Sequence, residues 1–467
     1  MALAEVPGLA LTVVRRGRPA LTRAYGKRDV ALGLPVTKRT LFALGSIAKS
    51  FTVLGLSMLA DEGRLDWDAP VRSQAPKLRL ARGPLADRVS ARDLVTHRTG
   101  MPRHDALWYF GAYGRDELLA RLRFLTPAAP LGTVFAYNNL MVAAAGRVLA
   151  RIEGAAWEGV MRRRLLAPLG MVRTRLSLAG FRAAPDRASG YFPGQDGRVA
   201  IPPRDTDAIA PAAAIYADAI EMGRYLRLLV NDGMFEGRRV APRRALREMR
   251  RARIATGRGR SYPERGATSY GMGFYLSRYR GHPLVYHPGV IDGFAAMISF
   301  LPDDGIGVVV LSNLSGSNPV PSIVSYAVYD RLLGLTPLPW IDRLRTRLAA
   351  RAARKSPNAP STAPSAAPPR PAQSYVGDYL HPAYGRLSIR AAPDGALSGA
   401  LHGARFTLIH AGGDAWRVAE TAWPIRAGLR VSFRFDGGAR AARLVTPLAD
   451  GPTYRLQAGD MVFARVK

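Results

Sequence analysis

The chain has 467 residues, of which 48% are hydrophobic, and its formal net charge of +32 comes mainly from arginine. This length allows a sizeable core and exceeds one average domain, so we expect two domains. The absence of cysteine excludes disulfides, thiol catalysis and cysteine-bound metals, and because no apolar run approaches about 20 residues, we expect no transmembrane segment.

Two apolar segments near the N-terminus are the first predicted elements. Residues 9–14 and 21–25 are rich in Leu, Val and Thr, and Arg15-Arg-Gly-Arg-Pro19 separates them. This pattern predicts two paired strands joined by a turn. The next feature is Gly45-Ser-Ile-Ala-Lys49, which precedes the apolar run of residues 51–60.

Ser46 stands three residues before Lys49 at the predicted start of a helix, so both side chains lie on one face. A serine hydroxyl becomes a nucleophile when a nearby base takes its proton. A lysine can be that base if burial or a helix N-terminus lowers its pKa. Such pairs also arise by accident on surfaces, but Lys49 is one of only six lysines and heads an apolar helix. The pair therefore predicts acyl-transfer chemistry.

Between residues 70 and 260 the sequence favours helices and loops, with an amphipathic helix over residues 218–230. Within this region Tyr137 stands two residues before Asn139, ahead of the apolar run 141–149. The phenol could relay a proton, and the amide could hold a substrate carbonyl. Taken alone, the segment would also fit a turn with a half-buried tyrosine.

Residues 270–313 predict strands, and Pro302-Asp-Asp-Gly305 predicts a hairpin turn between residues 294–301 and 306–311. The same region contains His287-Pro288-Gly289. Gly289 would allow a substrate backbone to approach closely, and His287 could donate to a carbonyl oxygen or carboxylate. A lone histidine beside Pro-Gly is otherwise more often structural.

The C-terminal part differs in composition. Residues 346–373 are rich in Pro, Ala and Ser and predict an extended linker. Beyond it, Leu429, Val431, Phe433 and Phe435 alternate with polar residues, which favours a small all-β barrel over residues 374–467. This tail has no nucleophile–base pair, so we expect it to supply no catalytic group and instead to limit access to a cleft or mediate self-association.

The three motifs, in the order Ser-x-x-Lys, Tyr-x-Asn and His-x-Gly, resemble those of the serine β-lactamase and penicillin-binding-protein-like superfamily, and especially class C β-lactamase-related serine hydrolases. The resemblance covers about residues 5–335 and includes the segments 93–100 and 270–274. It implies a β-lactamase/transpeptidase-like α/β (α+β) fold over residues 1–345, with an antiparallel sheet, flanking helices and a helical subdomain. The tail is similar to the lipocalin-like domain of some penicillin-binding-protein-like hydrolases.

The resemblance also implies roles for the catalytic residues. Ser46 would attack a carbonyl, Lys49 would take or share its proton, and Tyr137 would pass a proton to the leaving group. Which of Lys49 and Tyr137 is the acylation base stays open. No metal or organic cofactor is implied.

On the substrate side, the resemblance implies that Asn139 orients the substrate and that His287 and Gly289 bind it. The backbone N–H groups of Ser46 and Val290 would form the oxyanion hole, in which each fixed donor contributes about 3 kcal/mol.

Pro288 stands where β-lactamases commonly carry a hydroxyl residue, so a donor to a β-lactam carboxylate is missing. The sequence therefore predicts a serine hydrolase that forms an acyl-enzyme on amide or ester bonds, as a peptidase, D-amino-acid peptidase or esterase. A β-lactamase or D,D-carboxypeptidase is the alternative. A non-catalytic basic protein that binds polyanions or nucleic acid would fit the charge, but no zinc-finger, basic-zipper or RNA-binding signature supports it.

The expected partners are a small-molecule or peptide substrate and, through the C-terminal domain, further copies of the chain, with no specific nucleic acid. As written, the sequence opens without a signal peptide, which predicts a cytoplasmic protein. A start further upstream would instead allow a periplasmic or secreted protein.

Overall fold

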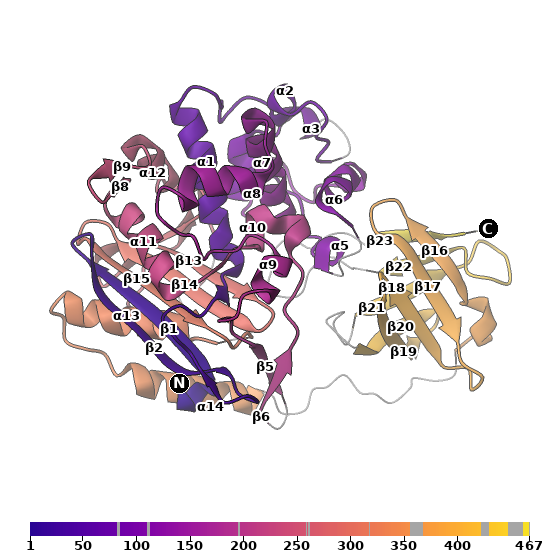
Figure 1. Ribbon diagram of the computed structural model, residues 1–467. Helices are drawn as coiled ribbons and strands as arrows, with labels where there is room; N and C mark the ends of the chain where they lie inside the picture. The colour runs from indigo at the N-terminus through magenta and orange to yellow at the C-terminus, as the bar shows by residue number, and fades with distance from the viewer. Residues whose placement is uncertain are drawn as a thin grey trace. The chain divides into compact units, whose positions relative to one another are not determined.

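The computed structural model describes residues 1–81, 85–109, 113–194, 197–257, 259, 262–316, 318–354, 368–421, 429–446 and 461–466. The chain forms two compact units (Figure 1). Unit 1 comprises Met1–Lys77, Asp87–Arg98 and Met141–Ala353, and unit 2 comprises Leu78–Ala86, Thr99–Leu140 and Arg354–Lys467.

Unit 1 is built on a nine-stranded antiparallel sheet in the order β10-β11-β12-β13-β14-β15-β1-β2-β3. The central strands β14 and β15 are buried along their whole length, which is typical of a sheet covered on both faces. The strands are β1 (Gly8–Arg15), β2 (Arg18–Asp29), β3 (Leu34–Pro35), β10 (Ile254–Ala255), β11 (Ser269–Tyr270), β12 (Tyr275–Tyr279), β13 (His282–Ile291), β14 (Phe294–Leu301) and β15 (Ile306–Ser312).

Both predicted hairpins are present. β14 and β15 pair around Pro302–Gly305, as expected. β1 and β2 also pair, but their connection is shorter than the predicted five-residue turn. Only Arg16 and Gly17 lie between the strands, with φ of 48° and 70°. Two residues with positive φ form the tight turn that matches the twist of paired strands, so β2 begins already at Arg18.

Helices α11 (Ala219–Val230) and α13 (Val320–Leu332) cover opposite faces of this sheet (Figure 1). A Cβ on Gly307 of β15 would touch Leu226 of α11. Tyr329 of α13 donates instead to Ser299, which pairs with Val308, the next residue of β15. Because successive residues of a strand face opposite sides, the two helices lie on different faces. The predicted helix over 218–230 is confirmed, with Asp218 as its N-cap.

Helix α1 (Ala48–Asp61) is buried from Ala48 to Leu59, and several contacts fix its position. The Phe51 ring stacks on Tyr225 of α11 with 3.7 Å between the ring centroids. The Tyr225 hydroxyl donates to Ser50 at 3.0 Å, and the Thr52 hydroxyl donates to the Pro211 carbonyl at 2.7 Å. A helix that is buried all round belongs to the core.

The other helices and short strands lie between and beyond these elements. They are α2 (Val71–Gln74), α3 (Leu85–Arg88), α4 (Ala91–Thr96), α5 (Ala106–Tyr109), α6 (Arg115–Arg121), α7 (Asn139–Glu153), α8 (Trp157–Met161), α9 (Leu178–Arg182), α10 (Ala210–Ala213), α12 (Arg243–Met249) and α14 (Trp340–Arg354), with the strand pairs β4 (Phe42–Ala43) and β7 (Tyr216–Ala217), β5 (Gly190–Gly194) and β6 (Gly197–Ile201), and β8 (Met234–Phe235) and β9 (Arg238–Arg239).

Helix α14 runs through Arg354 and so extends into the range 346–373 that the sequence assigns to a linker. This part of the range is rich in Ala, Leu and Arg, which are strong helix formers. Residues 355–367 of the predicted linker lie outside the described residues.

Unit 2 contains the predicted β-barrel, which is closed and has eight strands (Figure 1). Val431 and Phe433 point into it, as their alternation with polar residues predicts. The strands are β16 (Gly377–His381), β17 (Gly385–Ala391), β18 (Leu397–Leu401), β19 (Ala404–Gly412), β20 (Ala415–Thr421), β21 (Arg430–Arg434), β22 (Arg443–Thr446) and β23 (Met461–Arg465).

The barrel shares unit 2 with residues 99–140, and specific hydrogen bonds join the two. The Tyr384 hydroxyl lies 2.8 Å from Nδ1 of His104. The Arg121 guanidinium donates to the carbonyls of Pro382 and Ala383, both at 3.1 Å. The barrel therefore packs directly on the chain segment that contains Tyr137 and Asn139.

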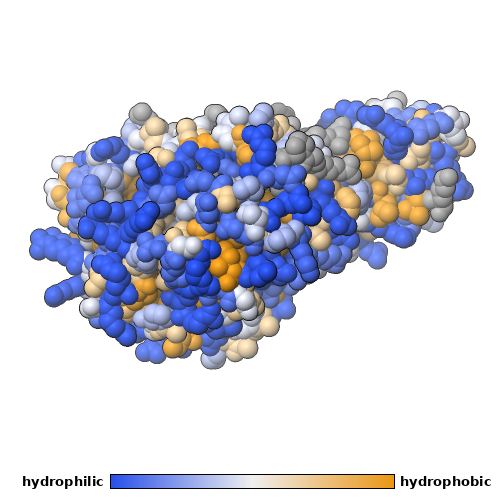
Figure 2. Space-filling model, turned by 90° about the horizontal axis from the view of Figure 1, so that it is seen from above, coloured by the Kyte–Doolittle hydropathy of each residue, from blue (hydrophilic) through white to orange (hydrophobic). Residues whose placement is uncertain are grey.

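Hydrophilic residues predominate on the face shown in Figure 2, as expected for a chain with 67 Lys and Arg residues. Across the described part of the chain, no helix combines the length and the apolar character needed to cross a membrane.

The buried His104 leads to a prediction about acid stability. Burial, with a smaller effect of His381, lowers the pKa of His104 from 6.5 to about 3. As the pH falls below 6.5, the unfolded chain binds this proton and the folded chain does not. We expect His104 to reduce the free energy of unfolding by about 2 kcal/mol between pH 7 and pH 5.

Urea unfolding at both pH values would measure this loss in the wild type and in His104→Gln. The variant should lose less stability on acidification, and equal losses in the two proteins would contradict the prediction.

Candidate active site

Ser46 lies in a short 3₁₀ turn, Gly45–Ile47, that continues directly into α1. The Lys49 side chain is fully buried, whereas Ser46 is partly exposed. Nζ of Lys49 lies 3.1 Å from Oγ of Ser46 and donates to the Ala212 carbonyl at 3.0 Å. The amine lies within hydrogen-bond reach of the hydroxyl, which is the geometry that transfer of the serine proton to the lysine requires.

The turn is held against the backbone of β13. Gly45 has a φ of 51°, and a Cβ there would lie 3.1 Å from the Val290 nitrogen. On β13 itself, a Cβ at Gly289 would lie only 2.0 Å from the Leu44 carbonyl oxygen. Glycine is therefore required on both sides of this contact, which brings the Val290 backbone next to the nucleophile turn.

The edge of β13 is open at this point. β12 pairs with β13 only from His282 to Tyr286. Among the described strands, none pairs with residues 287–291 on that side. An open strand edge presents backbone donors and acceptors to another extended chain, so it can bind a substrate backbone beside Ser46.

His287 shares a strand face with Gly289, because the two are two residues apart on β13. Its side chain is only 1% exposed. Nδ1 lies 2.8 Å from the Pro288 carbonyl oxygen, and Nε2 lies 3.2 Å from the Tyr270 hydroxyl. A carbonyl can only accept, so Nδ1 carries a proton and donates to it, while Nε2 is occupied by the Tyr270 hydroxyl. His287 must exchange one of these bonds before it can donate to a substrate.

Tyr270 lies between His287 and His97. The His97 ring is 4.9 Å from the Tyr270 ring, and His97 is fully buried with a φ of 59° at the end of α4. Tyr270 also contacts Tyr275 edge-on at 4.7 Å. His97 at the C-cap of α4 thus forms one aromatic group with side chains from β11, β12 and β13.

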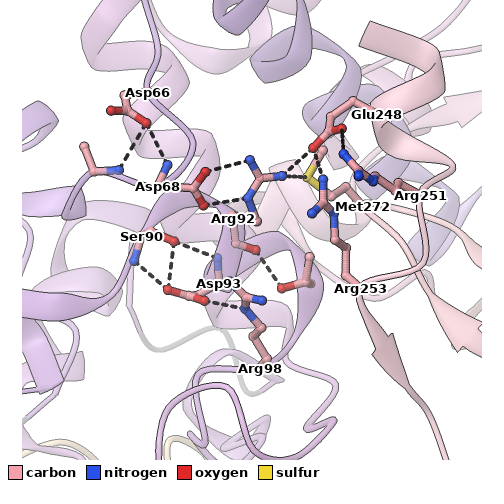
Figure 3. A network of polar contacts seen from close by, with 12 residues as sticks. Asp66, Asp68, Ser90, Arg92, Asp93, Arg98, Glu248, Arg251, Arg253 and Met272 are labelled. Atoms are coloured by element: carbon pink, nitrogen blue, oxygen red, sulfur yellow. Dashed lines mark hydrogen bonds and ion pairs between the residues drawn. The ribbon is translucent and has the colours of Figure 1, made fainter. Parts of the chain in front are cut away.

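An ion-pair network outside this group joins α4 to the neighbouring elements (Figure 3). Arg92 donates twice to Asp68, at 2.7 and 2.9 Å, and once to Glu248 at 2.5 Å. Its guanidinium also contacts the sulfur of Met272, which lies between β11 and β12. Hydrogen bonding from Arg92 holds the pKa of Asp68 below its usual value, so the pair stays charged. The network fixes α4, and with it His97, relative to Tyr270.

Tyr137 and Asn139 lie in unit 2, in the turn before α7 and at its first residue. Both are largely buried. Nδ2 of Asn139 donates to Asp105 at 3.1 Å. The Arg103 guanidinium lies 5.5 Å from the centre of the Tyr137 ring and pairs with Asp105. Contacts with Arg103 and Asp105 therefore hold the Tyr-x-Asn segment in place.

The structure thus gathers Ser46, Lys49, His287, Gly289 and Val290 in unit 1, while Tyr137 and Asn139 belong to unit 2. The described residues contain no group of three or more His, Cys, Asp or Glu side chains arranged to hold a metal ion.

Sequence reasoning missed three supporting groups: the Ala212 carbonyl, Tyr270 and Asp105. Tyr270 lies in a segment that carries the family resemblance, which was a usable signal. A backbone carbonyl 163 residues from Lys49 and a carboxylate 34 residues from Asn139 give no local signal.

A serine–lysine pair at the head of a buried helix, beside an antiparallel sheet, is the arrangement of serine acyl-transfer enzymes. A model of the β-lactamase family matches residues 1–332. The chain belongs to this family of serine hydrolases, which confirms the resemblance inferred from the motifs.

Several known proteins are similar over much of the chain. The unguisins hydrolase of Aspergillus campestris is 28% identical over 82% of this chain and 74% of that protein. Protein flp of Staphylococcus aureus is 22% identical over 69% of this chain and 62% of its own length.

Among solved structures, an octameric penicillin-binding-protein homologue from Pyrococcus abyssi has a TM-score of 0.64 and 22% identity, covering 99% of this chain and 97% of that one. A class C β-lactamase from Rhodobacter sphaeroides has a TM-score of 0.58 and 22% identity, covering 71% and 96%. These structures show the common fold.

The contact between Gly289 and Leu44 leads to a prediction. In Gly289→Ala the new Cβ would push the β13 edge away from the nucleophile turn. A displacement of about 1 Å in an active site can cost about 100-fold in rate, so we expect kcat/KM for an ester to fall by about this factor. Steady-state kinetics would measure it.

Gly159→Ala is the matched control, because a Cβ at Gly159 meets nothing within 4 Å. It should keep wild-type kinetics. Wild-type activity in a folded Gly289→Ala protein would show that the close contact is dispensable.

Proposed function

We propose that the protein cleaves amide or ester bonds through an acyl-enzyme on Ser46. The observation that supports this most directly is the fully buried Lys49 amine 3.1 Å from the partly exposed Ser46 hydroxyl. The open edge of β13 beside this pair supplies a place for an extended substrate. Membership of a serine hydrolase family agrees with the proposal.

In the proposed acylation step, Oγ of Ser46 bonds to the substrate carbonyl carbon, and its proton passes to Lys49 or Tyr137. The backbone N–H groups of Ser46 and Val290 stabilise the oxyanion. When the carbon–nitrogen or carbon–oxygen bond breaks, the leaving group takes a proton relayed by Tyr137. Water then attacks the acyl-enzyme, releasing the acid and returning the proton to Ser46.

For the substrate, we propose peptides, including D-amino-acid peptides, and simple esters. Asn139 would orient the substrate, and the β13 backbone at Gly289 would bind the substrate backbone along the open edge. We expect a β-lactam to bind less well, because its carboxylate would lack a donor. Pro288 offers no hydroxyl, and His287 already bonds to Tyr270 and to the Pro288 carbonyl. The relatives named as unguisins hydrolases support a hydrolytic role.

Ser46 can be tested with a fluorophosphonate probe and p-nitrophenyl acetate. We expect one covalent adduct on Ser46 and loss of ester turnover in Ser46→Ala. Lys49→Ala should lower kcat by about 100-fold or more, the scale of lost acid–base help. A panel of esters, D- and L-amino-acid amides and nitrocefin would then rank the substrates.

Ser57→Ala is a suitable control, because Ser57 is a buried serine of the same helix whose hydroxyl has no partner among the described residues. It should keep wild-type turnover. Full activity in folded Ser46→Ala would overturn the proposal.

We also propose that copies of the chain associate through the outer face of the barrel. Leu380 on β16 and Val462 on β23 are 50% and 45% exposed, and a structural neighbour is described as octameric. Sedimentation velocity should show an oligomer that the double substitution Leu380→Glu and Val462→Glu dissociates. A monomeric wild type at micromolar concentration would contradict this.

A further inference from the structure

We propose that the β16–β17 turn of the barrel, residues 381–385, positions Tyr137 and Asn139 for catalysis. The barrel would then be needed for full turnover although it contributes no reacting group. This inference rests on the proposed function, because it assigns a positioning role relative to the same reaction. The contacts that carry it all lie within unit 2.

Residues 101–105 hold the Tyr-x-Asn segment in place. Asn139 donates to Asp105, and Asn138 donates to the carbonyls of Met101 and Pro102 at 3.2 and 2.7 Å. Asp105 also accepts from Trp108 at 2.7 Å, which holds its carboxylate in place. A shift of residues 101–105 would therefore move the amide groups of both asparagines.

The barrel in turn contacts residues 101–105 at His104. His104 is 1% exposed and has a φ of 51°, a conformation that costs energy for a residue with a side chain. Such a conformation persists only when its surroundings impose it. The Tyr384 hydroxyl, itself fully buried, bonds to Nδ1 of His104 at 2.8 Å. This contact ties the barrel turn to the residue between Arg103 and Asp105.

A second contact fixes the same turn. Arg121 of α6 donates to the carbonyls of Pro382 and Ala383, and its guanidinium stacks 3.8 Å from the centre of the Tyr113 ring. A Cβ on Gly385, where φ is 74°, would lie 2.4 Å from the Tyr113 hydroxyl. The turn therefore contacts residues 99–140 at two separate places, His104 and the Arg121–Tyr113 pair. Loss of one hydrogen bond should weaken this contact without detaching the barrel.

The direct test is Tyr384→Phe in the full-length chain, which removes the hydroxyl and keeps the ring. We expect kcat for a p-nitrophenyl ester to fall about tenfold, the scale of one lost buried hydrogen bond. A wild-type kcat in the folded Tyr384→Phe protein would overturn the inference.

Tyr379→Phe is the matched control. Tyr379 is another fully buried tyrosine of the barrel, and its hydroxyl donates to the Tyr375 carbonyl at 2.7 Å, within the barrel itself. It should lower thermal stability as much as Tyr384→Phe but keep wild-type kcat. Equal kcat values in the two variants would overturn the inference.

A double-mutant cycle tests the route of the effect. In an Asn139→Ala background the route from Asp105 to Asn139 is lost while the route through Asn138 remains, so Tyr384→Phe should lower kcat by less than tenfold. An undiminished tenfold loss in that background would show that the barrel acts elsewhere. Failure of the proposed function would instead appear as turnover in Ser46→Ala, which separates the two conclusions.

Discussion

The structure depends most on the close approach of the β13 backbone to the turn that begins α1. Gly289 lies against the Leu44 carbonyl, and Gly45 lies against the Val290 backbone. A side chain at either position would separate the strand from the turn. The contact sets the position of Ser46 because both partners are themselves fixed. β13 is held in the sheet, and α1 is held in the core through Phe51, Ser50 and Thr52.

The ion pairs around the contact between β13 and α1 orient neighbouring elements more than they add to the free energy of unfolding. Exposed ion pairs contribute only about 0–1 kcal/mol each, and many arginine pairs of this chain are of that kind. The Arg92 side chain differs, since it is 11% exposed and binds both oxygens of Asp68 while also reaching Glu248. Such a fork fixes direction as well as distance. Its effect is to hold α4, and therefore His97, against Tyr270.

The sequence predicted those features that depend on neighbours in the chain. A serine and a lysine three residues apart share a face wherever the chain turns as a helix, and Ser46 and Lys49 do so across the turn that leads into α1. The hairpin at Pro302–Gly305 follows from its turn residues, and the barrel pattern around Val431 follows from local alternation. The Arg16–Gly17 turn is three residues shorter than predicted, and α14 extends nine residues into the predicted linker, because strand twist and helix propensity set such boundaries.

Partners far apart in sequence could not be predicted in this way. Nothing near Lys49 indicates the Ala212 carbonyl, and nothing near His104 indicates Tyr384, 280 residues further along. Similarly, a lone histidine in a strand gives no information on whether its ring nitrogens bond to protein or to substrate. Only the fold shows that His287 bonds to Tyr270 and to its own neighbouring carbonyl.

The contact between the barrel and residues 99–140 has one property that suits a positioning element. The reacting groups of a serine hydrolase exchange protons during each cycle, so their hydrogen bonds change. His104 does not take part in this exchange, because burial lowers its pKa to about 3 and keeps the ring neutral at ordinary pH. Its bond to Tyr384 therefore keeps the same character while the chemistry proceeds. Asn139 is bonded to Asp105, the residue after His104, so the Tyr-x-Asn segment is joined to the barrel through a contact that does not titrate.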